Sequence, residues 1–251
     1  MSFDIGRVRR ALPGRRIEFF DSLPSTQPVA VKLAEEGASA GTAVLADEQT
    51  AGIGRAGHSW HSEAGAGLYV SLILHPPLEP ATRPILTLAL GLAAAEAIAR
   101  VAGIRCDLRW PNDLMFGDRK LAGILVQIAG DAAVAGIGIN VGHETFPDEI
   151  AGLATSIRIE TGDTYSREDL LIDLLKSADS YAKMLAEAGK AAIINAFTRV
   201  STYARGKRVY VDMGDREIAG VTAGLDDYGF LRVRKPNGDI ETVMAGGVRP
   251  A

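Results

Sequence analysis

The segment from Gln49 to Trp60 (QTAGIGRAGHSW) concentrates residues that could bind an anion. It holds three glycines, Gly52, Gly54 and Gly57, within six positions, and glycine permits backbone conformations and close ligand approach that a side chain would block. Arg55 adds a permanent cation whose planar donors suit phosphate or carboxylate oxygens. The segment is either an anion-binding loop or a flexible surface loop, and motifs elsewhere in the chain are needed to distinguish the two.

A second segment, RWPNDLMFGDRKLAGIL (109–125), places polar groups at a turn between apolar strands. Asn112 and Asp113 put an amide and a carboxylate in a proline-stiffened turn, where they either face a cleft or bond their own backbone. Lys120 lies where the chain returns as a strand, and it is either solvated or directed at a ligand. Gly123 lets a ligand approach the backbone while its apolar neighbours stay buried.

Three smaller features carry alternatives of their own. Ser25, Thr26 and Gln27 stand at a helix start, where they cap the helix or recognise a polar head group. Asn140 lies in the apolar strand GIGINV, and a buried amide needs a backbone or ligand partner. His58 and His61 are three positions apart with no predicted helix under them to bring them together, so we expect no metal site formed by the protein.

The hydrophobic periodicity predicts the elements that position these residues. Strands are expected at 17–20, 42–46, 67–74, 106–110, 121–128 and 133–141, with a hairpin turn at 130–131 between the last two. Helices are expected from Ser25 or Thr26 to just before Gly37, over 84–100, from Ser166 to about 185, and from about 190 to 200. The segment 84–100 is almost uniformly apolar and rich in alanine, which indicates a buried core helix rather than a membrane span.

From about residue 206 onward the pattern changes to four or five short alternating strands separated by turns. Such a small module gains stability by docking on a larger one. We therefore predict an α+β fold, with a mixed-sheet catalytic domain over residues 1–203 and a small C-terminal β-barrel over residues 204–251.

The composition indicates which classes of binding partner and which cellular compartment to expect. The net charge of −4 gives no basic surplus, so we expect small ligands or proteins as partners and no nucleic acid. The basic N-terminus has no long apolar run behind it, so neither a secretory signal nor a membrane anchor is expected. Cys106 is the only cysteine, which excludes an intrachain disulfide and favours the cytoplasm.

The motifs taken together resemble those of the biotin protein ligases over nearly the whole chain. They are STQ (25–27), QTAG (49–52) continuing into the GxGRxGxxW pattern, WPND (110–113), KLAGIL (120–125) and GIGINV (136–141), in that order. The order of WPND before KLAGIL is the most specific part. Because few residues precede the first predicted strand, the chain resembles the monofunctional type without an N-terminal DNA-binding domain.

The resemblance implies a reaction, cofactors and partners. Such enzymes make biotinyl-5′-adenylate from biotin and ATP, with Mg²⁺ held largely through the phosphates, and transfer biotin to a lysine of a biotin carboxyl carrier protein or domain. The family fold is an α+β catalytic domain of the biotin/lipoate ligase type followed by a small barrel of the Src-homology-3 type. No membrane partner is implied, and a homodimer is possible.

The resemblance also assigns roles to residues. Catalytic roles fall to Lys120, Arg55 and Asp113, the last as a base or an orienting group for the acceptor lysine. The biotin-binding residues are Ser25, Thr26, Gln27, Gln49, Gly52 and Gly123. The nucleotide-binding residues are Arg55, Trp60, Asn112, Lys120 and Asn140.

Two positions depart from the family pattern. Ile53 and His58 stand where many relatives have arginines, which predicts a weaker hold on the adenylate. The alternatives are a lipoate protein ligase, against which the WPND turn argues, and a non-catalytic biotin-binding relative. Retention of Arg55, Lys120 and Asp113 argues against the second alternative.

Overall fold

A computed structural model describes residues 3–76 and 84–251 of the chain, and its main feature is a seven-stranded mixed sheet. The strands are β1 (Ile17–Leu23), β2 (Ala43–Gln49), β3 (Gly67–Leu74), β4 (Asp107–Arg109), β5 (Asp113–Phe116), β6 (Arg119–Ala129) and β7 (Ala132–Asn140). They lie in the order β1-β2-β3-β7-β6-β5-β4. β1 and β2 are parallel, and the other neighbouring strands pair antiparallel.

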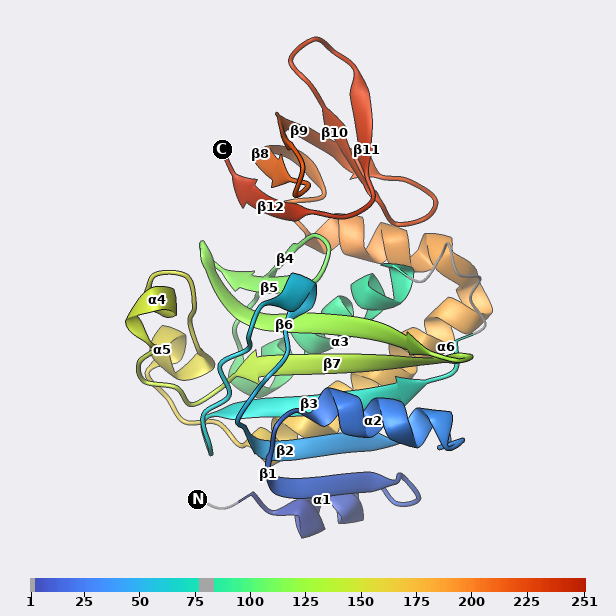
Figure 1. Ribbon diagram of the computed structural model, residues 1–251, viewed down its shortest axis with the longest axis vertical. Helices are drawn as coiled ribbons and strands as arrows, with labels where there is room; N and C mark the ends of the chain where they lie inside the picture. The colour runs from blue at the N-terminus through green and yellow to red at the C-terminus, as the bar shows by residue number, and fades with distance from the viewer. Residues whose placement is uncertain (1–2, 77–83) are drawn as a thin grey trace.

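Helices cover both faces of this sheet (Figure 1). The helix α2 (Thr26–Glu35) lies on one face, and the long helices α3 (Pro84–Ala102) and α6 (Arg167–Val200) lie on the other. The described residues that accompany the large sheet also form three short helices: α1 (Ile5–Ala11), α4 (Asp148–Ala151) and α5 (Ile157–Thr161). Two apolar cores result, a large one between the sheet and α3/α6 and a small one under α2.

The prediction of a buried core helix at 84–100 is confirmed. α3 is long and apolar enough to cross a membrane, but 67% of its most apolar stretch is buried inside the protein, where it packs against α6. The two predicted helices after residue 166 are the two parts of α6, which a kink separates at Gly189, whose φ of 74° is non-helical. The hydroxyl of Ser166 accepts a hydrogen bond from the Asp169 N–H and caps the start of α6.

A second, five-stranded antiparallel sheet forms the C-terminal module. Its strands are β8 (Arg205–Asp212), β9 (Glu217–Leu225), β10 (Leu231–Arg234), β11 (Ile240–Val243) and β12 (Gly247–Pro250), in the order β11-β10-β9-β8-β12. Among the described residues nothing pairs β11 with β12, so the prediction of a barrel is wrong in that the sheet is open. Both edge strands have only four residues, which leaves little backbone with which to close it.

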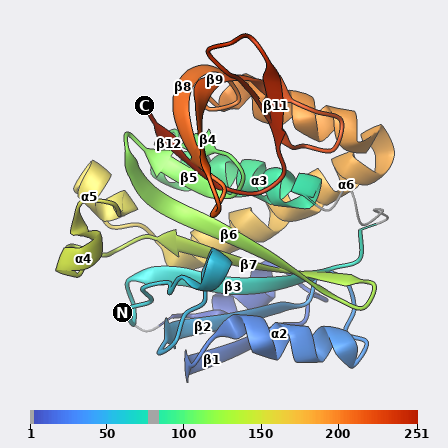
Figure 2. The ribbon, with the colours of Figure 1, turned by 45° about the horizontal axis from the view of Figure 1, so that its top comes forward.

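The small sheet docks over one end of α3 and of α6 (Figure 2). The indole N–H of Trp110 donates to the carbonyl of Gly229 at 2.9 Å. Gly229 in turn lies against Ile85 and Leu88 of α3. The turn of the WPND motif is thus anchored to the C-terminal module at its first residue.

The predicted strands of the large sheet are all present, and the hairpin between β6 and β7 is confirmed. The strand β5 is not among the predicted elements, because the turn signal of Asn112 and Asp113 leads straight into the strand pattern of β6. The helices α1, α4 and α5, which have seven, four and five residues, are not among them either. Helices of this length have too few turns to show an apolar stripe.

Candidate active site

A pocket opens on the α2 face of the large sheet, over β3, β6 and β7. We refer to it as the first pocket; its volume is about 450 Å³, including its open mouth. Its lining includes nine of the predicted site residues, Ser25, Thr26, Gln27, Gln49, Arg55, Trp60, Asn112, Lys120 and Gly123, together with residues of β3, β6 and β7. Segments far apart in the sequence therefore converge where the motifs predicted.

One end of the first pocket is a connected set of hydroxyls and amides. The Gln49 Oε1 accepts from the Thr26 N–H at 2.9 Å, and the Thr26 hydroxyl lies 2.8 Å from that of Ser71. The Ser71 hydroxyl donates to Gln27 Oε1 at 2.9 Å, while Gln27 Nε2 donates to the Val134 carbonyl. Ser25 caps α2 through its hydroxyl. These buried polar groups are fixed in position by one another and offer both donors and acceptors.

Glycines in β6 and β7 make room for the side chains that form the pocket. A Cβ at Gly138 would lie 2.5 Å from the indole of Trp60, and one at Gly136 would lie 2.7 Å from Gln27 Oε1. Gly123, paired with Gly138 across the two strands, would place a Cβ 3.0 Å from the same indole. The Trp60 ring can therefore lie close to β6 and β7 only because Gly123 and Gly138 lack side chains.

The other end of the first pocket carries a compact charge cluster. Lys120 Nζ lies 2.5 Å from Asp113 Oδ1, and Arg109 Nη2 lies 2.8 Å from Asp113 Oδ2. Burial opposes ionisation of this carboxyl, but Lys120 and Arg109 outweigh it and hold the pKa of Asp113 below its usual range. Lys120 Nζ also lies 5.3 Å from the centre of the Trp60 ring. The lysine is thus held at the pocket as a cation beside an ionised carboxylate.

A second pocket continues from the first, between the glycine-rich segment, the WPND turn and the small sheet. Its volume is about 1170 Å³, including its open mouth, and its lining includes Arg55, Asp113 and Lys120. The guanidinium of Arg55 donates to Asn112 Oδ1 and to the Gly246 carbonyl, both at 3.0 Å. Arg55 therefore joins the glycine-rich segment to the turn and to the C-terminal module.

Two predicted site residues lie away from the pocket linings. The side chain of Asn140 is buried, and its Nδ2 donates to the Thr155 carbonyl at 2.9 Å, which is the backbone alternative that the sequence left open. Gly52 lies behind Gln49, and a Cβ there would come within 2.4 Å of the Trp60 carbonyl. Its glycine identity is explained by close approach of the backbone.

Several pocket residues were missed from the sequence. Tyr69 and Ser71 of β3 face the first pocket, and their polar side chains at alternate positions of an otherwise apolar strand were a usable signal. Gly136 and Gly138 of β7 carried the same period-two signal. Gly246, in contrast, contacts Arg55 across the domain junction, and no local pattern marks it.

Two parts of the chain match known families. Residues 19–144 match the biotin/lipoate A/B protein ligase family. Residues 205–248 match the biotin protein ligase C-terminal domain. The first match covers the motifs that line both pockets. The second covers most of the small sheet, including the residues 212–214 and 245–247 that complete the second pocket.

Individual relatives support the same grouping. The biotin–[acetyl-CoA-carboxylase] ligase of Paracoccus denitrificans is 35% identical over 85% of this chain and 92% of its own length. The bifunctional ligase/repressor BirA of Bacillus subtilis is 37% identical over 67% of this chain, which spans 54% of that protein. A solved structure of the Aquifex aeolicus biotin protein ligase with biotin and ATP superimposes with a TM-score of 0.84 at 32% identity, covering 94% of this chain and 99% of that one.

Proposed function

Because the chain belongs to the biotin/lipoate A/B protein ligase family, we propose that it activates biotin with ATP and attaches it to a carrier protein. The product of the first step is biotinyl-5′-adenylate, and the acceptor in the second is a lysine of a biotin carboxyl carrier protein or domain. The observation that carries the proposal is the position of Lys120. It lines both pockets, where a carboxylate from one and a phosphate from the other would meet.

The first pocket suits biotin better than an aliphatic acid. A ureido ring presents donors and acceptors together, and the Thr26, Gln27, Gln49 and Ser71 network can match both. A lipoate tail offers no hydrogen bonds to this network, so the network would contribute nothing to the recognition of lipoate. The names of the relatives also point to biotin, as does the match of the small sheet.

In the first step, a biotin carboxylate oxygen bonds to the α-phosphorus of ATP, and the α–β phosphoanhydride bond breaks to release pyrophosphate. Lys120 stabilises the negative charge that builds up on the transferring group, as a preplaced cation does in phosphoryl chemistry. Arg55 is the second cation available to phosphate oxygens. Mg²⁺ would be held mainly by the phosphates and water, because Asp113 is already paired with Lys120 and Arg109.

In the second step, the acceptor amine attacks the acyl carbon, the acyl–phosphate bond breaks, and AMP leaves. The amine must first lose a proton to solvent, since an ordinary lysine is an ammonium ion at neutral pH. The lowered pKa of Asp113 makes it a weak base, which supports a role in orienting the amine rather than in accepting its proton. A homodimer, the absence of nucleic-acid partners and a cytoplasmic location stay predictions.

The test combines ATP, Mg²⁺ and an apo carrier domain with either biotin or lipoate. We expect pyrophosphate release and modification of the carrier lysine in the reaction that contains biotin, and neither in the reaction that contains lipoate. Lys120→Ala should lower adenylate formation at least about a hundredfold, while Lys183→Ala, at a side chain that is 72% exposed on α6, should not change it. Transfer of lipoate would favour the alternative ligase, and binding of biotin without any transfer would favour a non-catalytic relative.

A further inference from the structure

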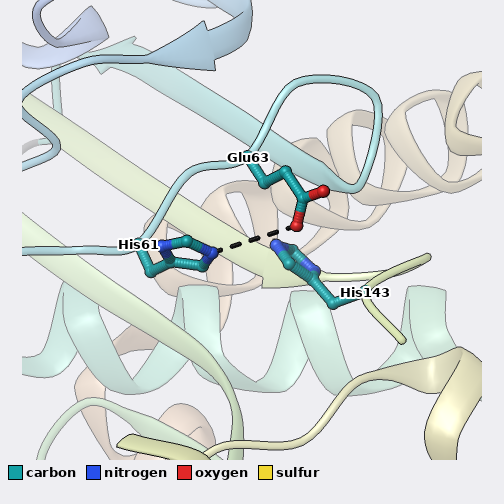
Figure 3. A group of neighbouring side chains, drawn as sticks. All are labelled: His61, Glu63 and His143. Carbon is teal, nitrogen blue, oxygen red and sulfur yellow. Dashed lines mark ion pairs between the residues drawn. The ribbon is translucent and has the colours of Figure 1, made fainter. Parts of the chain in front are cut away.

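Three side chains with metal-binding groups meet beside the site although they are far apart in the sequence (Figure 3). His61 and Glu63 lie in the unpaired stretch between Trp60 and β3, and His143 lies just beyond the end of β7. One ligand atom from each falls within 4.8 Å of the others. His61 Nε2 and Glu63 Oε2 lie 4.0 Å apart.

His143 is held rigidly at the centre of this cluster. Its side chain is buried, and its ring stacks on Phe146 with centroids 5.0 Å apart. Its carbonyl accepts from the Ser156 hydroxyl at 2.6 Å. The Tyr69 hydroxyl lies 3.3 Å from His143 Nε2 and also donates to the backbone carbonyl of Glu63. His143 and the backbone of Glu63 are thus held in place by contacts within the protein.

The imidazole of His143 has binding capacity that the protein does not use. Its Nδ1 is buried and finds no hydrogen-bond partner among the described residues, and buried polar atoms are usually paired. A solvated ion pair between His61 and Glu63 would account for only two of the three residues. At 4.0 Å and with Glu63 58% exposed, such a pair adds little stability. It would leave the burial of His143 unexplained.

Two imidazoles and one carboxylate are a donor set that Zn²⁺ uses, with the fourth position open to water. Ligand atoms around a tetrahedral zinc lie roughly 3.3 Å apart, given bonds of about 2.0–2.1 Å. The three atoms must therefore approach one another by about 1.5 Å at most. Rotation of the exposed Glu63 side chain and the partly exposed His61 ring can supply this movement while His143 stays in place.

We propose that His61, Glu63 and His143 bind one divalent transition-metal ion, for which Zn²⁺ is the best chemical match. The bound ion would connect the end of β7 to the segment that follows Trp60 in the chain. Because the Trp60 ring covers Gly123 and Gly138, the ion would fix the C-terminal end of the glycine-rich segment from outside both pockets. The site itself does not depend on the proposed function.

The test uses the purified full chain, freed of affinity tag and metal, with Zn²⁺ alone in competition with a chromophoric chelator. We expect one equivalent of Zn²⁺ per chain. His61→Ala and Glu63→Gln should each weaken binding at least about tenfold. His58→Ala, which removes a neighbouring histidine outside the cluster, should leave the affinity unchanged. Co²⁺ should give visible absorption bands that both cluster variants lose.

His143→Gln should also lose Zn²⁺, but its burial makes misfolding a concern, so circular dichroism must accompany it. His61→Ala and Glu63→Gln change one partly exposed and one exposed side chain, so their effect on Zn²⁺ binding does not depend on the folding of His143→Gln. Absence of stoichiometric Zn²⁺ binding by the unaltered chain would overturn the proposal, as would equal affinity in these two variants. The Zn²⁺ titration contains no biotin or ATP. A failure to bind Zn²⁺ therefore leaves the proposed ligase function standing, and a failure to transfer biotin leaves the proposed metal site standing.

Discussion

Replacing Gly138 by alanine tests whether glycine is required in β7 to make room for Trp60. The new Cβ would lie 2.5 Å from both Cε2 and Nε1 of the indole, about 1 Å inside ordinary van der Waals contact. Overpacking of this kind costs about 1–3 kcal/mol. We expect Tm to fall by roughly 2–4 °C per kcal/mol, and the displaced indole to weaken adenylate binding.

A double-mutant cycle separates this clash from other effects of the substitution. In a Trp60→Ala background the clash is gone, so Gly138→Ala should be neutral or stabilising by up to about 1 kcal/mol, because alanine loses less backbone entropy than glycine. Gly142→Ala is the matched control, since its Cβ would meet nothing closer than 3.7 Å. Thermal unfolding followed by circular dichroism measures each protein. An equal cost of Gly138→Ala in both backgrounds would refute the reasoning.

Three further outcomes follow from the charges and exposures of the site and core. The pKa of Asp113 is lower in the folded state than in the unfolded chain, where it is about 3.9. Ionisation of Asp113 therefore stabilises the fold at pH values above about 3.9, and this stabilisation is lost as the pH falls through the pKa of the folded state. Asp113→Asn should therefore lower the free energy of unfolding in urea by about 3–5 kcal/mol near neutral pH and by much less in acid. A difference between the two proteins that does not change with pH would contradict this. Burial and the nearby carboxylates of Asp107 and Glu160 raise the pKa of Cys106 to about 12, so iodoacetamide should label this thiol slowly until urea unfolds the protein. Equal labelling rates with and without urea, measured by mass spectrometry, would count against this expectation. Ile53 is 46% exposed at the first pocket, and Ile53→Arg should slow release of preformed adenylate, whereas unchanged or faster release would argue otherwise.

The strands and the long helices could be predicted because each has its own periodic pattern or cap. The apolar run of β3 and the Ser166 cap of α6 are local signals, and the structure places both elements as expected. The β5 strand has only four residues, Asp113–Phe116, so the turn signal of Asn112 and Asp113 outweighed it. The open small sheet could not be anticipated either, because barrel closure depends on how edge strands meet in space.

The site was predictable where its residues sit in compact motifs. The STQ, WPND and KLAGIL motifs converge on one pocket, since each lies at an element end that the sheet brings together. Contacts between distant segments were not predictable. His143 next to His61 and Gly246 next to Arg55 are set by tertiary packing, which leaves no trace in local spacing.

Among the described residues the guanidinium of Arg55 makes two hydrogen bonds, and this has a thermodynamic consequence. One goes to Asn112 Oδ1 and one to the Gly246 carbonyl, which leaves three of its five N–H donors for the oxygens of an anion. Since Gly246 belongs to the C-terminal module, binding of an anion by Arg55 and attachment of that module share one cation. The two events are therefore coupled, and each changes the equilibrium constant of the other by the same factor.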